Sequence, residues 1–296
     1  MKQMVILSGK GGTGKTTVAA ALAHLMSQQY SMVLADADVD APNLGLILDP
    51  ENVRSEAFFA GVRAEIDEDL CIGCGTCQEV CRFEAIVETD DAYAVVPVKC
   101  EGCATCFYQC PADAIRLDEC LSGHWHRART RFGPFVHALL CAGEENSGKL
   151  VAQVREQANT WAEEVNADWV LIDGSPGIGC PVIAAVTGVD LALLVCEPTV
   201  SGVHDLERVM GVTEHFGVPA LVCINKSDIN ETLTAQIEAY CAERKVPVVA
   251  KIPYDEVVIS AMRQRKALTE LPDNPVGAQM RALWSELRQL ADVEPA

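Results

Sequence analysis

The sequence has few basic residues, few aromatic residues and no long apolar segment. No stretch approaches the ~20 unbroken apolar residues that a membrane-spanning helix needs, so we expect no stable membrane insertion. Only 23 Lys and Arg stand against 42 Asp and Glu, giving a net charge of −19. We expect no nucleic-acid partner, because nucleic acid, like anionic lipid, attracts a positive surface. The first residues show no secretory signal, and we expect a cytoplasmic protein.

One local exception to the acidic balance lies at residues 124–131, where Arg127, Arg129 and Arg131 alternate at strand spacing. Such alternation places the three side chains on one face of a strand. A solvated strand face is the favoured interpretation. A docking patch for an acidic partner is the alternative.

Cysteine, in contrast, is abundant, with 14 residues. In a reducing cytosol, thiols at two-residue spacing favour metal binding over disulfides. Eight of them form two runs of the pattern C-x2-C-x2-C-x3-C, and the second run lies 29 positions after the first. The same offset carries Ala85-Ile86 onto Ala114-Ile115, so the region is an internal repeat. The spacing is typical of bacterial ferredoxins that hold two [4Fe–4S] clusters.

In such ferredoxins the fourth cysteine of each run binds the cluster of the other run. We therefore expect a first cluster on Cys71, Cys74, Cys77 and Cys110, and a second on Cys81, Cys100, Cys103 and Cys106. Zinc is the competing metal for paired C-x2-C spacings, but the repeated set of eight fits two clusters better. Pro111 follows Cys110, as the bacterial pattern expects, whereas Arg82 stands at the equivalent place after Cys81.

A glycine-rich loop at residues 9–17, GKGGTGKTT, lies between an apolar strand and a helix expected at about 15–29. Phosphate binding needs glycines that turn backbone N–H groups toward the anion, a lysine for its oxygens and a hydroxyl for Mg²⁺. We expect the turn to be made by Gly11, Gly12 and Gly14. Lys15 is expected to bind the β/γ-phosphates, and Thr16 the metal. The helix adds its positive end. The strand and helix on either side make a mere glycine turn the weaker interpretation.

The rest of the chain predicts an α/β fold with a mostly parallel sheet. Helices expected near 149–165, 181–187, 202–216 and 231–244 each precede a short apolar strand, and further helical segments lie at 255–267 and 276–291. Strands of this kind are typical of parallel sheets covered on both faces. The pattern breaks where the cysteines are dense. We expect one domain from residues 1–60 and 119–296, with residues 61–118 inserted as a ferredoxin domain.

The last helical segment has one apolar stripe, formed by Met280, Leu283, Trp284, Leu287 and Leu290. Its polar face carries few basic residues, unlike a helix that lies on a membrane surface. We expect it to pack against the sheet.

The second lysine of the glycine loop, Lys10, resembles the deviant Walker A loop of the MinD/ParA family of P-loop ATPases. DADVDAPNL at 36–44 and DGSPGIG at 173–179 resemble the two switch segments of that family. The resemblance implies an ATP-dependent homodimer, or a heterodimer with a paralogue, in which Lys10 reaches the phosphates bound by the other subunit. It also implies that Asp38 activates the attacking water, and that Asp173 joins Thr16 at Mg²⁺. Asp36 and Asp40 lie in the same switch, so the choice of Asp38 depends on the resemblance alone.

Asn225 ends the segment VCIN and resembles the family residue that recognises the base; Asp255 falls where the family closes the other side. Such a residue also occurs at strand ends for ordinary turn reasons. The expected catalytic residues are Lys10, Lys15 and Asp38. The expected ATP contacts are Gly11, Gly12, Thr13, Gly14, Lys15, Thr16, Thr17 and Asn225.

Nearly the whole chain is similar to MinD-superfamily ATPases that carry an inserted two-cluster ferredoxin domain, some of them encoded near the genes of the orange protein complex. Segments at 137–151, 174–184 and 196–209 add to this similarity. It implies ATP, Mg²⁺ and two [4Fe–4S] clusters as cofactors. Since the insertion lies between the two switches, the leading hypothesis is an ATP-gated electron carrier with a redox protein as partner.

Two other functions stay open. One is a MinD/ParA-type positioning ATPase whose clusters are structural or sense redox state. The other is a cluster carrier, which the absence of any C-x2-C after Cys110 disfavours. Cys180, just after the second switch, is expected to be a buried inert thiol, with a bridging metal at a dimer interface as the alternative.

Overall fold

The computed structural model describes residues 1–90 and 92–292, without the side chains of the last three. The chain forms two compact units. The sheet unit comprises Met1–Glu56, Trp125–Leu139 and Ser147–Ala296, and the cysteine unit comprises Ala57–His124 and Leu140–Asn146. The cysteine unit includes the segment expected as an insertion, and extends beyond it on both sides.

Within the described residues, the main sheet has nine strands in the order β11-β10-β9-β1-β8-β2-β7-β6-β3. Every pair from β11 to β7 in this order is parallel. The central strands are buried along nearly their whole length, as expected for a sheet covered on both faces. The strands are β1 (Lys2–Ser8), β2 (Met32–Asp36), β3 (Glu51–Ile66), β6 (Ile115–Thr130), β7 (Gly133–Leu140), β8 (Trp169–Pro176), β9 (Leu191–Cys196), β10 (Ala220–Asn225) and β11 (Val248–Ile252).

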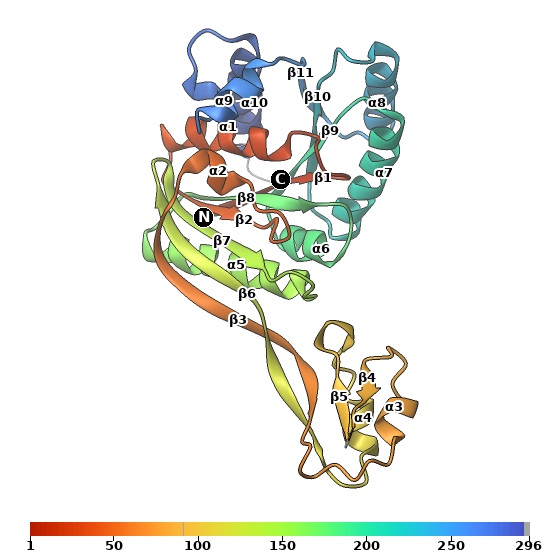
Figure 1. Cartoon of the computed structure of the whole chain (residues 1–296). Coiled ribbons are helices and arrows are strands. Elements are labelled where there is room, and N and C mark those ends of the chain that lie inside the picture. The colour runs from red at the N-terminus through yellow and green to blue at the C-terminus, as the bar shows by residue number, and fades with distance from the viewer. Residues whose placement is uncertain (91, 293–296) are drawn as a thin grey trace. The chain divides into compact units, whose positions relative to one another are not determined.

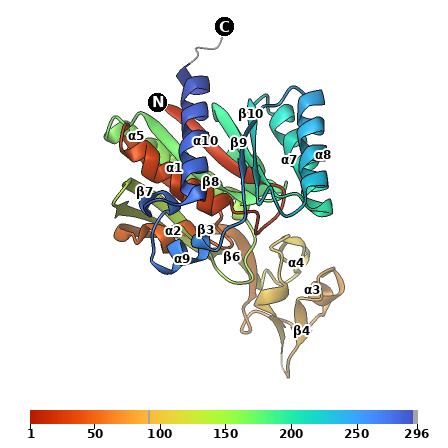
Figure 2. The ribbon, with the colours of Figure 1, turned by 90° about the horizontal axis from the view of Figure 1, so that it is seen from above.

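Helices cover both faces of this sheet (Figures 1 and 2). One face carries α1 (Lys15–Ser27), α2 (Leu44–Leu48), α9 (Val257–Arg263), the short 3₁₀ helix η2 (Leu268–Glu270) and α10 (Pro275–Asp292). The other carries α5 (Ser147–Glu164), α6 (Cys180–Val186), α7 (Val200–His215) and α8 (Glu231–Glu243). The predicted α/β fold with a mostly parallel sheet is therefore confirmed.

The apolar stripe of α10 packs in the core of the sheet unit. Met280, Leu283, Trp284 and Leu287 are buried in the same cluster as the apolar face of α1, which confirms the predicted packing. Leu290 lies outside the residues whose side chains are described. None of the described helices has the length and apolar content to cross a membrane.

The cysteine unit repeats one local pattern twice. Helix α3 (Thr76–Glu79) follows the first pair of cysteines of the first run, and α4 (Thr105–Gln109) follows the equivalent pair of the second. The residues before them, Gly75 and Ala104, have positive φ of 76° and 61° and correspond to one another in the repeat. Between the two halves lie β4 (Ile86–Glu88), antiparallel to β5 (Tyr93–Val95), and the 3₁₀ helix η1 (Pro97–Lys99).

Candidate functional site

The glycine loop joins β1 to α1 and lines a cavity of about 560 Å³. This volume lies in the usual range for a small-molecule site. Gly12 and Gly14 have φ of 79° and 92°, where glycine alone is unstrained. The lining includes all predicted loop residues from Gly11 to Thr17, together with Asp38 and Asp40 of the first switch.

Lys15 is buried in this cavity between two predicted site carboxylates. Its Nζ lies 3.2 Å from Asp173 Oδ1 and 3.8 Å from Asp38 Oδ2. Burial alone lowers the pKa of Lys15, but the carboxylates of Asp173, Asp38 and Asp36 together raise it above its ordinary value. The lysine therefore stays charged, as binding to phosphate oxygens requires.

Asp36 and Asp173 end neighbouring strands β2 and β8 and are paired in register. Asp36 accepts the N–H groups of Asp38 and Leu44 at 3.1 Å each, so it fixes the first switch. Burial, and then the charge of Asp173, raises the pKa of Asp36 well above its usual range. The sequence offered this structural role only as an alternative, because an aspartate at the end of a buried strand is a weak signal for it.

One oxygen of Asp173 has no hydrogen-bond partner among the described residues, although it is buried. The Oγ1 of Thr13 is in the same condition. A buried carboxylate oxygen left free beside a phosphate loop suits a hard cation such as Mg²⁺, which prefers oxygen ligands. Thr16 lines the same cavity, so Thr16 and Asp173 fit the predicted metal.

Asp38 is partly buried at the other side of Lys15. Its Oδ1 accepts the N–H of Ala41 at 3.4 Å. Burial raises the pKa of Asp38 although the charge of Lys15 opposes the shift. The structure thus brings together Lys15, Asp38 and Asp173, which lie far apart in the sequence.

Lys10 does not lie in the described lining of this cavity. Its Nζ pairs with Glu197 at 2.6 Å and donates to Thr199 Oγ1 and Ser201 Oγ at 3.0 Å each. The carboxylate of Glu197 also forms an ion pair with Lys226, with 2.9 Å between Oε2 and Nζ. Burial opposes the ionisation of Glu197, but hydrogen bonds from Lys10 and Lys226 hold the pKa of Glu197 below the usual range. Sequence reasoning missed Glu197; its position just after a parallel strand was the available signal.

Asn225 supports the glycine loop in this structure. Its Nδ2 donates to the carbonyl of Thr13 at 2.7 Å, and Lys226 donates to that of Gly12 at 3.2 Å. A Cβ on Gly14 would lie 2.2 Å from the Asn225 amide, so close packing requires glycine there. Asp255 accepts the N–H of Val257 at 2.8 Å. The base-recognition role of Asn225 stays a prediction.

The cysteine unit contains two hollows, each lined by four cysteines from both runs. The first is lined by Cys71, Cys74, Cys77 and Cys110. The second is lined by Cys81, Cys100, Cys103 and Cys106. All eight thiols are free of disulfides. Each hollow therefore gathers the four cysteines that the sequence assigns to one cluster.

Within the described residues, no three His, Cys, Asp or Glu side chains converge on one point as ligands of a metal ion. The thiols instead surround an apolar space. Tyr93 and Ile115 line the first hollow, and Phe83 and Val95 line the second.

Backbone N–H donors serve the thiols equally in the two halves. Ala85 and Ala114 direct N–H groups at Cys81 and Cys110 Sγ, at 3.4 Å each. Hydrogen bonds with Thr76 and Thr105 lower the pKa values of Cys74 and Cys103. Such donors stabilise thiolates, which are the ligands of iron–sulfur clusters.

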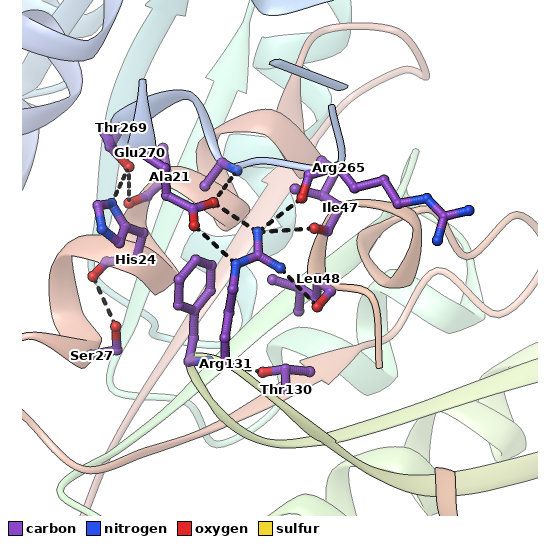
Figure 3. Close-up of polar contacts among 12 residues, drawn as sticks. Ala21, His24, Ser27, Ile47, Leu48, Thr130, Arg131, Arg265, Thr269 and Glu270 are labelled. Carbon is purple, nitrogen blue, oxygen red and sulfur yellow. Dashed lines mark hydrogen bonds and ion pairs between the residues drawn. The ribbon is translucent and has the colours of Figure 1, made fainter. Parts of the chain in front are cut away.

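The structure bears on two interpretations of the sequence, that of the arginine segment at residues 124–131 and that of Cys180. Arg127 pairs with Glu164 at 3.0 Å, and Arg131 binds Glu270 and backbone carbonyls (Figure 3). Both are therefore engaged within the chain rather than free for a partner. The expectation that Cys180 is buried is wrong: it is exposed, because it is the first residue of α6 and follows directly on the exposed turn of the second switch.

Comparisons with known proteins agree with this geometry. Residues 4–268 match the model of the CobQ/CobB/MinD/ParA nucleotide binding domain. An uncharacterized protein of Methanocaldococcus jannaschii is 37% identical over 230 residues, covering 77% of this chain and 79% of that protein. An uncharacterized ATP-binding protein of the same organism is 24% identical over 288 residues, covering 96% and 86%.

Among solved structures, the septum site-determining protein MinD of Pyrococcus horikoshii, complexed with Mg-ADP, shares the fold. Its TM-score is 0.60 at 19% identity, and the match covers 99% of this chain and 98% of that one. The family model spans most of the chain, and the glycine loop lines one cavity together with Asp38 and Asp40. The chain therefore belongs to the CobQ/CobB/MinD/ParA family of nucleotide-binding proteins.

Proposed function

We propose that this protein is a Mg²⁺-dependent ATPase that couples ATP binding, hydrolysis and dimerisation to electron transfer through two [4Fe–4S] clusters to a redox protein. One observation carries the proposal: each of two separate hollows is lined by the four cysteines that the exchanged ferredoxin pattern assigns to one cluster. An electron carrier needs such built sites, whereas an ordinary nucleotide switch does not.

The nucleotide chemistry follows from the cavity of the sheet unit. Lys15 and the loop N–H groups hold the phosphates, and Thr16 and Asp173 hold the metal, which when bound neutralises phosphate charge. Asp38 orients the attacking water. Its raised pKa suits it to accept a proton in the transition state. Lys10 serves the phosphates of the other subunit in a dimer.

The cysteine unit provides the other half of the proposal. The thiols bind the clusters, and their amide and hydroxyl donors stabilise the charge that the thiolates bear. The apolar linings limit water at the sulfur atoms. The clusters, when bound, supply one-electron chemistry. The inserted ferredoxin domain is accordingly assigned to residues 61–118, inside the cysteine unit.

The comparisons favour the alternative at the level of the family. A positioning ATPase of the MinD/ParA type explains the sheet unit equally well, and the solved neighbours include MinD proteins. Those solved structures are less than 25% identical to this chain, so they show only that the fold is shared. The paired hollows support cluster binding, which a positioning ATPase with structural or redox-sensing clusters shares. Dependence of electron transfer on the nucleotide state is what separates the two functions.

The decisive experiment is anaerobic reconstitution followed by metal analysis and EPR of the reduced protein. We expect eight iron and eight sulfide per chain. Cys71→Ala and Cys110→Ala should remove the same EPR signal although they belong to different runs, and Cys81→Ala should remove the other. Cys180→Ser is the matched control and should keep both. Zinc without sulfide would contradict the cluster proposal.

Coupling is tested with the reconstituted protein. Electron transfer to a dye or protein acceptor should differ between the ATP, ADP and nucleotide-free states. Equal rates in all three would leave the positioning function as the better one.

A further inference from the structure

Arg131 stands on a rigid base in the turn between β6 and β7. Thr130 Oγ1 donates to the carbonyl of Gly133 at 2.9 Å and accepts the N–H of Phe132 at 3.2 Å. Gly133 has φ of 137°, and a Cβ there would lie 2.8 Å from the carbonyl of Met32 on β2. The turn is therefore fixed against a central strand of the sheet.

The guanidinium of Arg131 joins three separate segments (Figure 3). It donates to the carbonyls of Ile47 and Leu48 at 3.1 and 2.9 Å, and to that of Arg265 at 3.0 Å. It also binds both carboxylate oxygens of Glu270, at 2.9 and 2.7 Å. Bonds from a charged donor to a helix C-terminus and a two-pronged bond to a carboxylate are stronger than neutral ones.

The helix that Arg131 holds directly follows the first switch. α2 has only five residues, too few to be stable alone. Its first residue, Leu44, binds Asp36, and its last two carbonyl groups bind Arg131. The switch before the helix, between Asp36 and Leu44, contains Asp38, and Ile47 of α2 lines the cavity. The short helix is thus held at both ends.

The third segment also reaches the cavity. Arg265 lies two residues after α9, whose Met262 belongs to the cavity lining. Arg265 pairs in addition with Asp49, next to α2, at 2.6 Å. Arg131 therefore gathers two elements that line the cavity, while the glycine loop is supported elsewhere by Asn225 and Lys226.

We infer that Arg131 is a positioning residue for ATP hydrolysis, which holds α2 and thereby sets the place of Asp38 opposite Lys15. The inference depends on the proposed role of Asp38. Because the phosphate loop does not rely on Arg131, loss of its side chain lowers kcat and leaves KM for ATP nearly unchanged.

The first test compares Arg131→Gln with Arg127→Gln. Arg127 is on β6, four residues before Arg131, pairs with Glu164 and stacks over Trp161 at 5.3 Å, so it is a matched control. We expect kcat to fall about tenfold for Arg131→Gln, since small misplacements of catalytic groups cost this much or more. KM should stay within about twofold, and Arg127→Gln should change neither constant by more than that. Arg131→Lys should restore part of kcat.

A double-mutant cycle separates positioning from general destabilisation. If Arg131 acts through Asp38, Arg131→Gln combined with Asp38→Asn has the kcat of Asp38→Asn alone. Multiplied effects would overturn the inference and leave the ATPase proposal standing. An unchanged kcat in Asp38→Asn itself would instead contradict the proposed role of Asp38, and the inference with it. If Arg131→Gln fails to fold, Glu270→Gln replaces it in the same cycle with the same criteria.

Discussion

In the proposed dimer, Lys10 must leave its contacts within the chain to reach the phosphates of the other subunit. In the single chain, this lysine is held by Glu197, Thr199 and Ser201. Leaving them for the phosphates of another subunit costs three polar contacts. Glu197 then keeps Lys226 as a partner, so its charge is not left unpaired, and the exchange is easier than the loss of a whole ion pair.

Lys10→Ala and Lys15→Ala should therefore fail in different ways. Lys10 lies outside the described lining of its own cavity, so Lys10→Ala should keep ADP affinity within about twofold but lose dimerisation with a non-hydrolysable ATP analogue. Lys15→Ala should lose nucleotide binding itself, by about tenfold or more. Calorimetry and sedimentation velocity measure the two properties. Equal loss of ADP affinity in both variants would contradict the assignment of Lys10 to the partner's phosphates.

His137 makes stability depend on pH in the acid range. Burial, and then the charge of His126, lower the pKa of His137 to about 4. The unfolded chain binds a proton near pH 6.5, which the folded chain accepts only near pH 4, so stability is full above pH 6.5 and falls as the pH drops through this window. His137→Gln should remove up to about 3 kcal/mol of that loss.

Urea unfolding at pH 7 and pH 4.5 measures the effect of His137 on stability. His204→Gln is the control, because His204 is largely exposed. A pH dependence that is the same in His137→Gln as in the wild type would contradict this prediction.

At the scale of helices and strands, the sequence predicted those strands that are buried on both faces of the sheet. The central strands are continuous apolar runs, and they occur where expected. The strand expected at residues 124–131 is the end of β6, but its beginning and the whole of the 16-residue strand β3 were missed. β3 is mostly exposed and has one buried residue, Ala64, so its sequence lacks the apolar run that marks a central strand. Likewise, the residues of the site were readable as motifs, but contacts such as Lys10 with Glu197 join residues too distant in the sequence to be foreseen.

The two halves of the cysteine repeat each contain a glycine at the same place in the loop, and the two glycines can be compared. Gly73 and Gly102 occupy equivalent places, with φ of 67° and 62°. A Cβ on Gly73 meets nothing within 4 Å, whereas one on Gly102 would lie 2.1 Å from the carbonyl of Val62 on β3. Gly73→Ala should cost about 1–2 kcal/mol of backbone strain. Gly102→Ala should cost clearly more, because a backbone atom cannot move aside.

Reconstituted protein distinguishes the two glycine substitutions. Gly102→Ala should lose the second cluster's EPR signal and about half of the iron, and Gly73→Ala should keep both signals. Equal iron content in the two variants would contradict the argument from space.

At the scale of the whole molecule, the chain passes between the units inside strands and not only through loops. β3 and β6 each begin in one unit and end in the other. The chain enters the cysteine unit again at Leu140 and returns to the sheet unit at Ser147, where α5 begins. The proposed coupling between the ATPase and the clusters would act through these backbone connections.

Thermodynamic linkage gives the sharpest test of this coupling. If ATP binding shifts the cluster potential, reduction must change ATP affinity by the corresponding factor, because coupling between two binding events is reciprocal. For a one-electron cluster, about 59 mV corresponds to a tenfold change in affinity. Redox titration with and without an ATP analogue should therefore agree with dissociation constants measured on oxidised and reduced protein. A potential that does not respond to nucleotide, in a protein that holds both clusters, would show the clusters to be uncoupled from the ATPase and would favour the positioning function.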